Sequence, residues 1–168
     1  VHSICSGQVI LDLSTSIKEL IENALDAKAT NIEIKIRDQG LTSIEVIDNG
    51  NGIFKEDYQS LCLRHHTSKL RTFTDLENVE TFGFRGEALS ALAAIANIEI
   101  ITCILENVPL ADHLTFDKSG KLLNSSNIAR SVGTTIIIKN LFHNLPVRLQ
   151  EFQRNIKKRT CRYGNWSI

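Results

Sequence analysis

Apolar and polar side chains alternate in Asn31-Ile32-Glu33-Ile34-Lys35-Ile36-Arg37, and Ser43-Ile44-Glu45-Val46-Ile47-Asp48 follows with Ile44 and Val46 two positions apart. Alternation with a period of two is typical of a strand that buries one face, and Asp38-Gln39-Gly40 between the two stretches favours a turn. The sequence therefore predicts an antiparallel hairpin of residues 31–37 and 43–48. Within the second strand, Asp48 shares a face with Ile44 and Val46.

The segment before this hairpin, residues 14–27, has the periodicity of an amphipathic helix. A single apolar stripe recurs at the spacing of helical turns and consists of Ile17, Leu20, Ile21, Ala24 and Leu25. Glu19, Asn23 and Asp26 fall on the opposite side at i, i+4 and i+7, so their side chains line up along one ridge. The ridge is either the polar outer face that an amphipathic helix needs or a set of functional groups.

Beyond the hairpin, strands and helices do not alternate regularly. We expect a helix at 56–64, a loop at 65–82, an apolar helix at 87–96 and a strand at 98–104, then a hairpin of residues 113–116 and 121–124, a strand at 134–139 and a helix at 147–158. An irregular order of this kind argues against a parallel doubly wound sheet. The predicted fold class is α+β, a two-layer sandwich of a mixed β-sheet with helices on one face.

The composition is that of one ordinary domain, with 168 residues, 42% of them hydrophobic and 23% charged. No apolar run is long enough to span a membrane. Lys and Arg number 19, as do Asp and Glu, so the charge balance gives no reason to expect strong DNA binding from this chain alone. The four cysteines match neither a zinc site nor a redox pair. Because the sequence contains no Met, we expect it to be a fragment.

Asp48 is the most informative single residue. A carboxylate on the buried face of a strand is costly unless something hydrogen-bonds it, and here Gly50 and Gly52 follow within four residues. Such a carboxylate could accept a hydrogen bond from a ligand amino group, while the glycines would let a flat ring approach the backbone. The alternative is a plain turn in which Asp48 caps the backbone.

The ridge of Glu19 and Asn23 also has two interpretations. A carboxylate that polarises a water molecule, with an amide oxygen one turn away as a hard ligand for Mg²⁺, suits hydrolytic chemistry. Further along, Gly83-Phe84-Arg85-Gly86 precedes the apolar helix and could bind an anion through exposed backbone N–H groups at a helix N-terminus. It is no Walker A loop, because no Gly-Lys-Ser/Thr follows.

Taken together and in order, these motifs resemble the ATP site of the GHKL superfamily, which includes gyrase B, Hsp90, histidine kinases and MutL. The motifs are residues 18–27 (Lys-Glu-Leu-Ile-Glu-Asn-Ala-Leu-Asp-Ala), 48–53 (Asp-Asn-Gly-Asn-Gly-Ile), 67–69 (Thr-Ser-Lys), 83–89 (Gly-Phe-Arg-Gly-Glu-Ala-Leu) and 133–135 (Gly-Thr-Thr). Thr-Ser-Lys and Gly-Phe-Arg-Gly-Glu-Ala-Leu are similar to MutL in particular. Residues 6–9, 65–69 and 141–148 most resemble the eukaryotic PMS-type subunit.

The resemblance implies a role for each motif. Glu19 would be the general base, Asn23 would ligate Mg²⁺, and Asp48 would receive the adenine amino group with Gly50 and Gly52 beside the ring. Thr134 would support the same end through water. The phosphates would be enclosed by a lid and cradle drawn from Thr67, Ser68, Lys69, Gly83, Phe84, Arg85, Gly86 and Glu87, within which Phe84 is expected to pack rather than to stack on the base.

The same resemblance implies a Bergerat-type ATPase domain at residues 1–158 that binds ATP and Mg²⁺. Slow hydrolysis would drive conformational change and dimerisation in DNA mismatch repair. The implied partners are an MLH-type MutL homologue in a MutL-alpha-like heterodimer and a MutS-type complex. DNA would be contacted mainly by regions beyond this chain, membranes would play no part, and the location would be the nucleus.

Three departures from the family qualify this expectation. Lys28 stands where the family usually has a glycine as a left-handed helix cap, which predicts a slightly less stable helix end. The family's N-terminal arm would precede Val1. Residues 159–168 are a divergent tail, and the second subdomain, which supplies a lysine to the terminal phosphate, would be absent. The alternative function is therefore a catalytically incomplete module that binds nucleotide or partner without hydrolysis.

Overall fold

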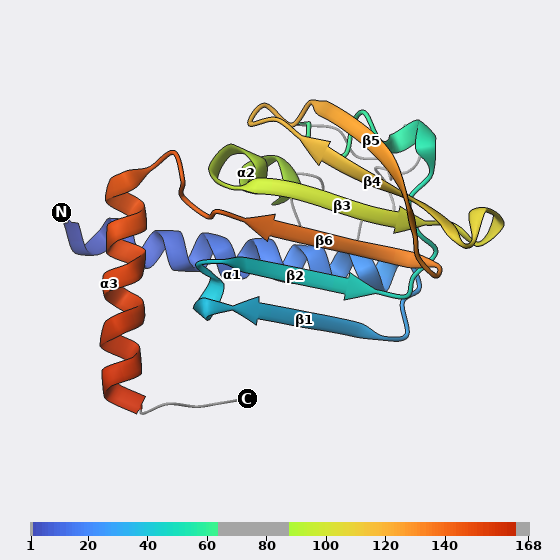
Figure 1. Ribbon diagram of the computed structural model, residues 1–168. Coiled ribbons are helices and arrows are strands. Elements are labelled where there is room, and N and C mark those ends of the chain that lie inside the picture. The colour runs from blue at the N-terminus through green and yellow to red at the C-terminus, as the bar shows by residue number, and fades with distance from the viewer. Residues whose placement is uncertain (1, 64–87, 164–168) are drawn as a thin grey trace, which may run out of the picture.

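The computed structural model describes residues 2–63 and 88–163 (Figure 1). The helices are α1 (His2–Asp26), α2 (Ala88–Ile95) and α3 (Pro146–Tyr163), and short 3₁₀ turns occur at Asp38–Gly40, Lys55–Asp57 and Leu105–Asn107. The strands are β1 (Ile32–Arg37), β2 (Ser43–Asp48), β3 (Asn97–Cys103), β4 (Leu110–Phe116), β5 (Leu122–Ala129) and β6 (Gly133–Lys139). None of the described helices has the length and apolarity that crossing a membrane requires.

The strands form one six-stranded sheet in the order β1-β2-β6-β3-β4-β5. Every pairing between these strands is antiparallel, whereas the sequence predicted a mixed sheet. The difference arises because β6 enters between β2 and β3 and runs antiparallel to both, so the parallel pair β2 and β3 never touch. The α+β class and the two layers are as predicted: α1 and α2 lie side by side against one face, and α3 stands across one end (Figure 1).

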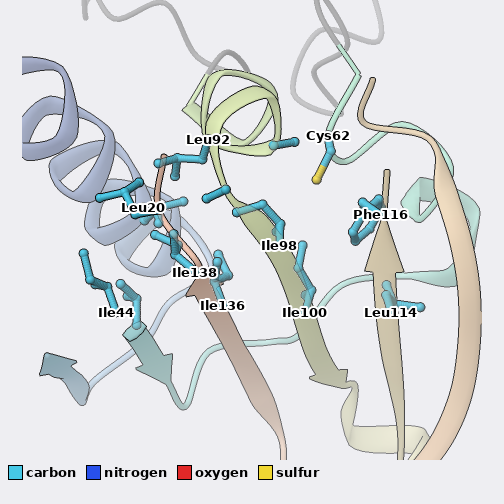
Figure 2. Packing of buried hydrophobic residues seen from close by; sticks show 14 of the residues in the cluster. Leu20, Ile44, Cys62, Leu92, Ile98, Ile100, Leu114, Phe116, Ile136 and Ile138 are labelled. Carbon is cyan, nitrogen blue, oxygen red and sulfur yellow. The ribbon is translucent and has the colours of Figure 1, made fainter. Parts of the chain in front are cut away.

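The core lies between the two helices and the sheet face they cover. Leu20 of α1 and Leu92 of α2 meet isoleucines of three strands, among them Ile138, Ile98 and Ile44 (Figure 2). The predicted alternation is confirmed in β2, where Ile44, Val46 and Asp48 are all buried. Close packing of branched side chains against two helices is the main stabilising contribution here.

The edge strand β1 is less buried than its sequence predicted. Ile34 and Ile36 keep 40% and 56% of their surface exposed, although they share a face with Ile44 and Val46. The helical layer contacts β2, not β1, among the principal packing contacts between elements. Leu25 was expected on the buried stripe of α1, but it is 56% exposed, whereas Leu20 and Ala24 of the same stripe are buried.

One expected element and the bounds of several others are corrected. The helix expected at 56–64 is a series of tight turns over its described part, in which Asp57 N–H donates to Phe54 O, and Ser60 N–H to Asp57 O. Their three-residue spacing is that of 3₁₀ turns, and this path buries Tyr58 and Cys62. Strands β4 and β5 are longer than expected. α1 starts before residue 14, and α3 extends past the expected helix end at residue 158.

Lys28 takes the left-handed conformation that the resemblance assigned to a glycine, with φ at 64°. Lys28 N–H donates to Leu25 O at 2.9 Å, and Ala29 N–H donates to Ala24 O at 3.0 Å. This pair of bonds is a Schellman motif, which closes a helix end with one residue at positive φ. The predicted position of the cap is confirmed, and the residue there bears a Cβ that glycine would lack.

Replacing Lys28 by glycine is expected to raise the free energy of unfolding by about 1 kcal/mol, because an L residue with a Cβ is strained in the left-handed region. Urea denaturation followed by circular dichroism measures the change. Lys28→Ala is the matched control, since it removes the charged side chain and keeps the Cβ. Equal unfolding midpoints for Lys28→Gly and Lys28→Ala would show that the cap carries no strain.

Candidate functional site

The carboxylate of Asp48 is buried at the end of β2, with 8% of the residue exposed. Its Oδ1 accepts hydrogen bonds from the backbone N–H of Gly50 at 2.8 Å and of Thr134 at 3.2 Å. These donors offset the cost of removing the carboxylate from water. The predicted burial of Asp48 is confirmed. The bond to Gly50 also supports the capping interpretation, whereas the bond to Thr134 comes from a strand 86 residues away.

Thr134 and Thr102 form a buried pair beside Asp48. Thr134 is 5% and Thr102 1% exposed, and their hydroxyl oxygens lie 3.1 Å apart. Thr102 Oγ1 also accepts the N–H of Ile53 at 2.9 Å. Because β6 lies between β2 and β3 and runs opposite to both, its first residues meet the last residues of the other two strands. Three strands therefore place polar groups at one end of the sheet.

The glycines around Asp48 are required by contacts within the protein. At Gly52, with φ at +78°, a Cβ would lie 2.3 Å from the carbonyl oxygen of Cys103. At Gly133, with φ at +125°, it would lie 2.1 Å from the carbonyl oxygen of Asp48. A Cβ on Gly50 would meet Ala27 O at 2.8 Å. The backbone approach that the glycines permit thus brings the 49–52 loop against α1 and β3, and it neither supports nor opposes a bound ring.

Hydrogen bonds tie the C-terminal end of α1 to the same loop. The side-chain oxygen of Asn49 accepts the N–H groups of Thr30 and Asn31, at 2.9 and 2.8 Å. Asn51 N–H donates to the carbonyl of Ala27 at 2.8 Å. The helical ridge that carries Glu19 and Asn23 therefore runs toward the 49–52 loop.

Asn23 lies one helical turn before Ala27 and Glu19 two turns before it, a rise of about 5.4 Å per turn. Both side chains are partly buried, whereas Asp26 is exposed. Glu19 and Asn23 are therefore less exposed than Asp26, the third residue of the ridge. The roles assigned to Glu19 and Asn23 stay predictions.

Arg130 is a further member of this end of the sheet. Its Nη2 donates to the Asp48 carbonyl and to Thr135 Oγ1, both at 3.0 Å. Burial lowers the pKa of the guanidinium, while the nearby Asp48 charge opposes that shift. An arginine keeps its charge even when its pKa is depressed, so Arg130 places a positive charge beside the carboxylate and joins β2 to β6.

The part of the sequence that forms this end of the sheet matches a known protein family. The sequence profile described as histidine kinase-, DNA gyrase B-, and HSP90-like ATPase matches residues 11–131. The chain belongs to this ATPase family. The matched segment contains α1 from residue 11 onward, Asp48 with the loop that follows it, Thr102 and Arg130, and it ends just before β6.

Among characterised relatives, PMS-type mismatch repair proteins are similar over nearly the whole chain. The DNA mismatch repair protein PMS1 of Arabidopsis thaliana is 56% identical over 158 residues, which are 94% of this chain and 17% of that protein. The mismatch repair endonuclease PMS2 of Homo sapiens is 54% identical over 94% of this chain and 18% of that protein. The chain thus spans less than a fifth of the length of these relatives.

Solved structures give the same result. The N-terminal domain of a DNA repair protein superposes with a TM-score of 0.75 at 47% identity, covering 94% of this ATPase-family chain and 44% of that one. The Aquifex aeolicus MutL ATPase domain complexed with ADP has a TM-score of 0.55 at 27% identity, covering 84% and 50%. The resemblance to MutL-type and PMS-type ATPase domains and the fold class are confirmed, and an ATP-binding role is supported.

The structure brings together Asp48, Gly50, Gly52 and Thr134, and it joins the helix that carries Glu19 and Asn23 to their loop. The rest of the predicted nucleotide site lies outside the described residues and stays a prediction, namely Thr67, Ser68, Lys69, Gly83, Phe84, Arg85, Gly86 and Glu87. Sequence reasoning missed Thr102 and Arg130. Thr102 had a usable signal, because it continues the buried face of Ile98 and Ile100 to the strand end, as Asp48 does in β2.

Proposed function

We propose that this ATPase-family chain binds Mg²⁺-ATP and hydrolyses it slowly, and that the bound nucleotide drives conformational change and dimerisation in DNA mismatch repair. The observation that carries the proposal is the buried Asp48 carboxylate, held by backbone N–H groups from its own loop and from β6. Turn capping needs only the first of these bonds. A buried acceptor held by donors from two strands is already positioned to receive a ligand amino group.

Asp48 would receive the adenine amino group. Both hydrogen bonds described above end on Oδ1, so Oδ2 is the oxygen that we assign to the ligand. A carboxylate that accepts a hydrogen bond in a buried place discriminates strongly against a base lacking the donor, because it would then be left desolvated. Gly50, Gly52 and Thr134 would surround the ring edge.

Asn23 would hold the magnesium ion. Among residues 2–63 and 88–163, no group of three or more His, Cys, Asp and Glu could bind a metal ion, so the other ligands would be phosphate oxygens and water. An amide oxygen is a suitable hard donor for such a shared site. When bound, the metal neutralises charge on the phosphates; orientation and protection of the nucleotide fall to the protein's own groups.

Glu19 would orient and deprotonate the attacking water from its place one turn before Asn23. The phosphates themselves would be held by Thr67, Ser68, Lys69 and by residues 83–87. Phosphoryl transfer of this kind needs positioning and charge stabilisation, without a covalent intermediate.

Isothermal titration with a non-hydrolysable ATP analogue, with and without Mg²⁺, tests binding. We expect saturable binding that Mg²⁺ strengthens, and Asn23→Ala should lose most of that strengthening, about tenfold or more in affinity for one lost charge-assisted contact. Asn127→Ala, on the exposed edge strand β5, is the matched control. Absence of saturable binding by the unaltered chain would contradict the proposal at its base.

We further propose that the intact protein acts in the nucleus, pairs with an MLH-type subunit and works with a MutS-type mismatch-recognition complex, with DNA held mainly outside this chain. The similarity to PMS-type mismatch repair proteins supports this assignment. Size-exclusion chromatography of the chain with an MLH-type ATPase domain, with and without nucleotide, tests the pairing. Elution as separate species under both conditions would count against it.

A further inference from the structure

Thr102 is a polar residue in an otherwise apolar row. It follows Ile98 and Ile100 on the buried face of β3 and is 1% exposed. A hydroxyl in such a place is costly unless it is fully hydrogen-bonded. Packing alone does not explain the threonine at position 102, because valine has nearly the same shape and carries no hydroxyl.

The Thr102 hydroxyl joins two separate pieces of chain. It accepts the N–H of Ile53 at 2.9 Å, and its oxygen lies 3.1 Å from Thr134 Oγ1 and 3.4 Å from the Gly133 carbonyl. One hydroxyl offers one donor and two acceptor positions, which these neighbours can use completely. Ile53 ends the loop that begins at Asp48, and Thr134 begins β6.

Both pieces lead directly to the Asp48 carboxylate. Thr134, whose hydroxyl meets Thr102, donates its own N–H to Asp48 Oδ1. The 49–53 loop, whose last N–H meets Thr102, donates Gly50 N–H to the same oxygen. Thr102 therefore bonds both pieces of chain that carry the donors to Asp48 Oδ1, although its own hydrogen bonds go to other atoms.

We infer that Thr102 is a positioning residue for base recognition: its hydroxyl holds the 49–53 loop and the start of β6 in the register that presents Asp48 to the ligand amino group. The inference rests on the proposed binding of ATP at Asp48. Without the hydroxyl, the Ile53 N–H loses its acceptor. The N–H groups of Gly50 and Thr134, which donate to Asp48 Oδ1, are then free to shift apart. Recognition of the amino group then weakens while the phosphate contacts are left in place.

Base discrimination measures this effect separately from general stability. The experiment compares the affinity of the 168-residue chain for ATP with its affinity for purine riboside triphosphate, which has hydrogen in place of the 6-amino group. We expect the unaltered chain to prefer ATP by at least about tenfold, the value of a hydrogen bond to a charged acceptor. Thr102→Val should reduce this preference by about three- to tenfold, and Thr102→Ser, which restores the hydroxyl, should keep it.

Ile98→Val is the matched control, because it alters the same buried face of β3 without touching the hydroxyl pair. It should leave the preference for ATP unchanged, even where it weakens binding of both nucleotides. If Thr102→Val does not fold, Thr102→Cys keeps the volume with a poor hydrogen-bonding group and should likewise reduce the preference.

The outcomes separate the inference from the function it deepens. An unaltered chain that binds both nucleotides equally overturns the assignment of adenine to Asp48, and the role of Thr102 with it. A preference for ATP that survives in Thr102→Val or Thr102→Cys overturns the positioning role alone. A reduced preference in the hydroxyl-free variants, with rescue by serine, supports it.

Discussion

Glu19→Ala is expected to abolish ATP turnover while leaving ATP binding intact. Glu19 is partly buried on α1, one turn before the residue assigned to magnesium. Removing a general base costs about 10²- to 10⁴-fold in the rate of the chemical step. Because the nucleotide would be held by Asp48, Asn23 and the residues assigned to the phosphates, its dissociation constant should change little. Single-turnover release of labelled phosphate, measured beside equilibrium binding, separates the two quantities.

Glu22 supplies the control for this experiment. It lies on the same helix, is exposed, and forms a surface ion pair with Lys18 at 3.6 Å, a pair that contributes little to stability. Glu22→Ala should therefore turn over ATP at the unaltered rate. Equal turnover in the unaltered chain and in Glu19→Ala would remove the assignment of the base. Binding without any turnover in the unaltered chain would instead favour the catalytically incomplete module.

Gly133→Ala should lower the free energy of unfolding by at least about 3 kcal/mol, since it combines a disfavoured backbone conformation with a backbone clash. The new Cβ would stand 2.1 Å from the Asp48 carbonyl oxygen and 2.8 Å from Asn49 Cα, at a φ of +125°. Neither neighbour is a flexible side chain that could move away. The strain falls where β2 meets β6, so nucleotide binding should be lost together with stability. Urea or thermal unfolding, with titration of any folded protein, measures both.

Ser131→Ala is the control, which shows whether stability is sensitive to substitution at Gly133 in particular or anywhere in the segment between β5 and β6. Ser131 is exposed two residues earlier, and its side chain can be shortened without introducing a Cβ where none existed. Its free energy of unfolding should stay within about 0.5 kcal/mol of that of the unaltered chain, as is usual for surface substitutions. A folded Gly133→Ala with an unchanged midpoint would mean that the β2–β6 junction yields more easily than its geometry indicates.

Local patterns predicted those parts of the fold in which neighbours along the chain also share a face. The hairpin of β1 and β2 follows from alternation with a turn between, and the helical stripe around Leu20 follows from the spacing of helical turns. The left-handed position of Lys28 followed from the resemblance alone. By contrast, the segment after Phe54 carries helix-like periodicity over too few residues to distinguish an α-helix from successive 3₁₀ turns.

By itself, the sequence determined that Asp48 ends a buried strand face and that Glu19 and Asn23 share one helical ridge, because strand and helix periods are properties of the local backbone. Only the tertiary structure decided that β6 enters between β2 and β3, so that Thr134 bonds Asp48 and Thr102 bonds Thr134 from strands distant in sequence. It also decided that β1 lies at an edge, where its isoleucines stay exposed. Such contacts depend on which surfaces exclude water together, and no short window of sequence contains that information.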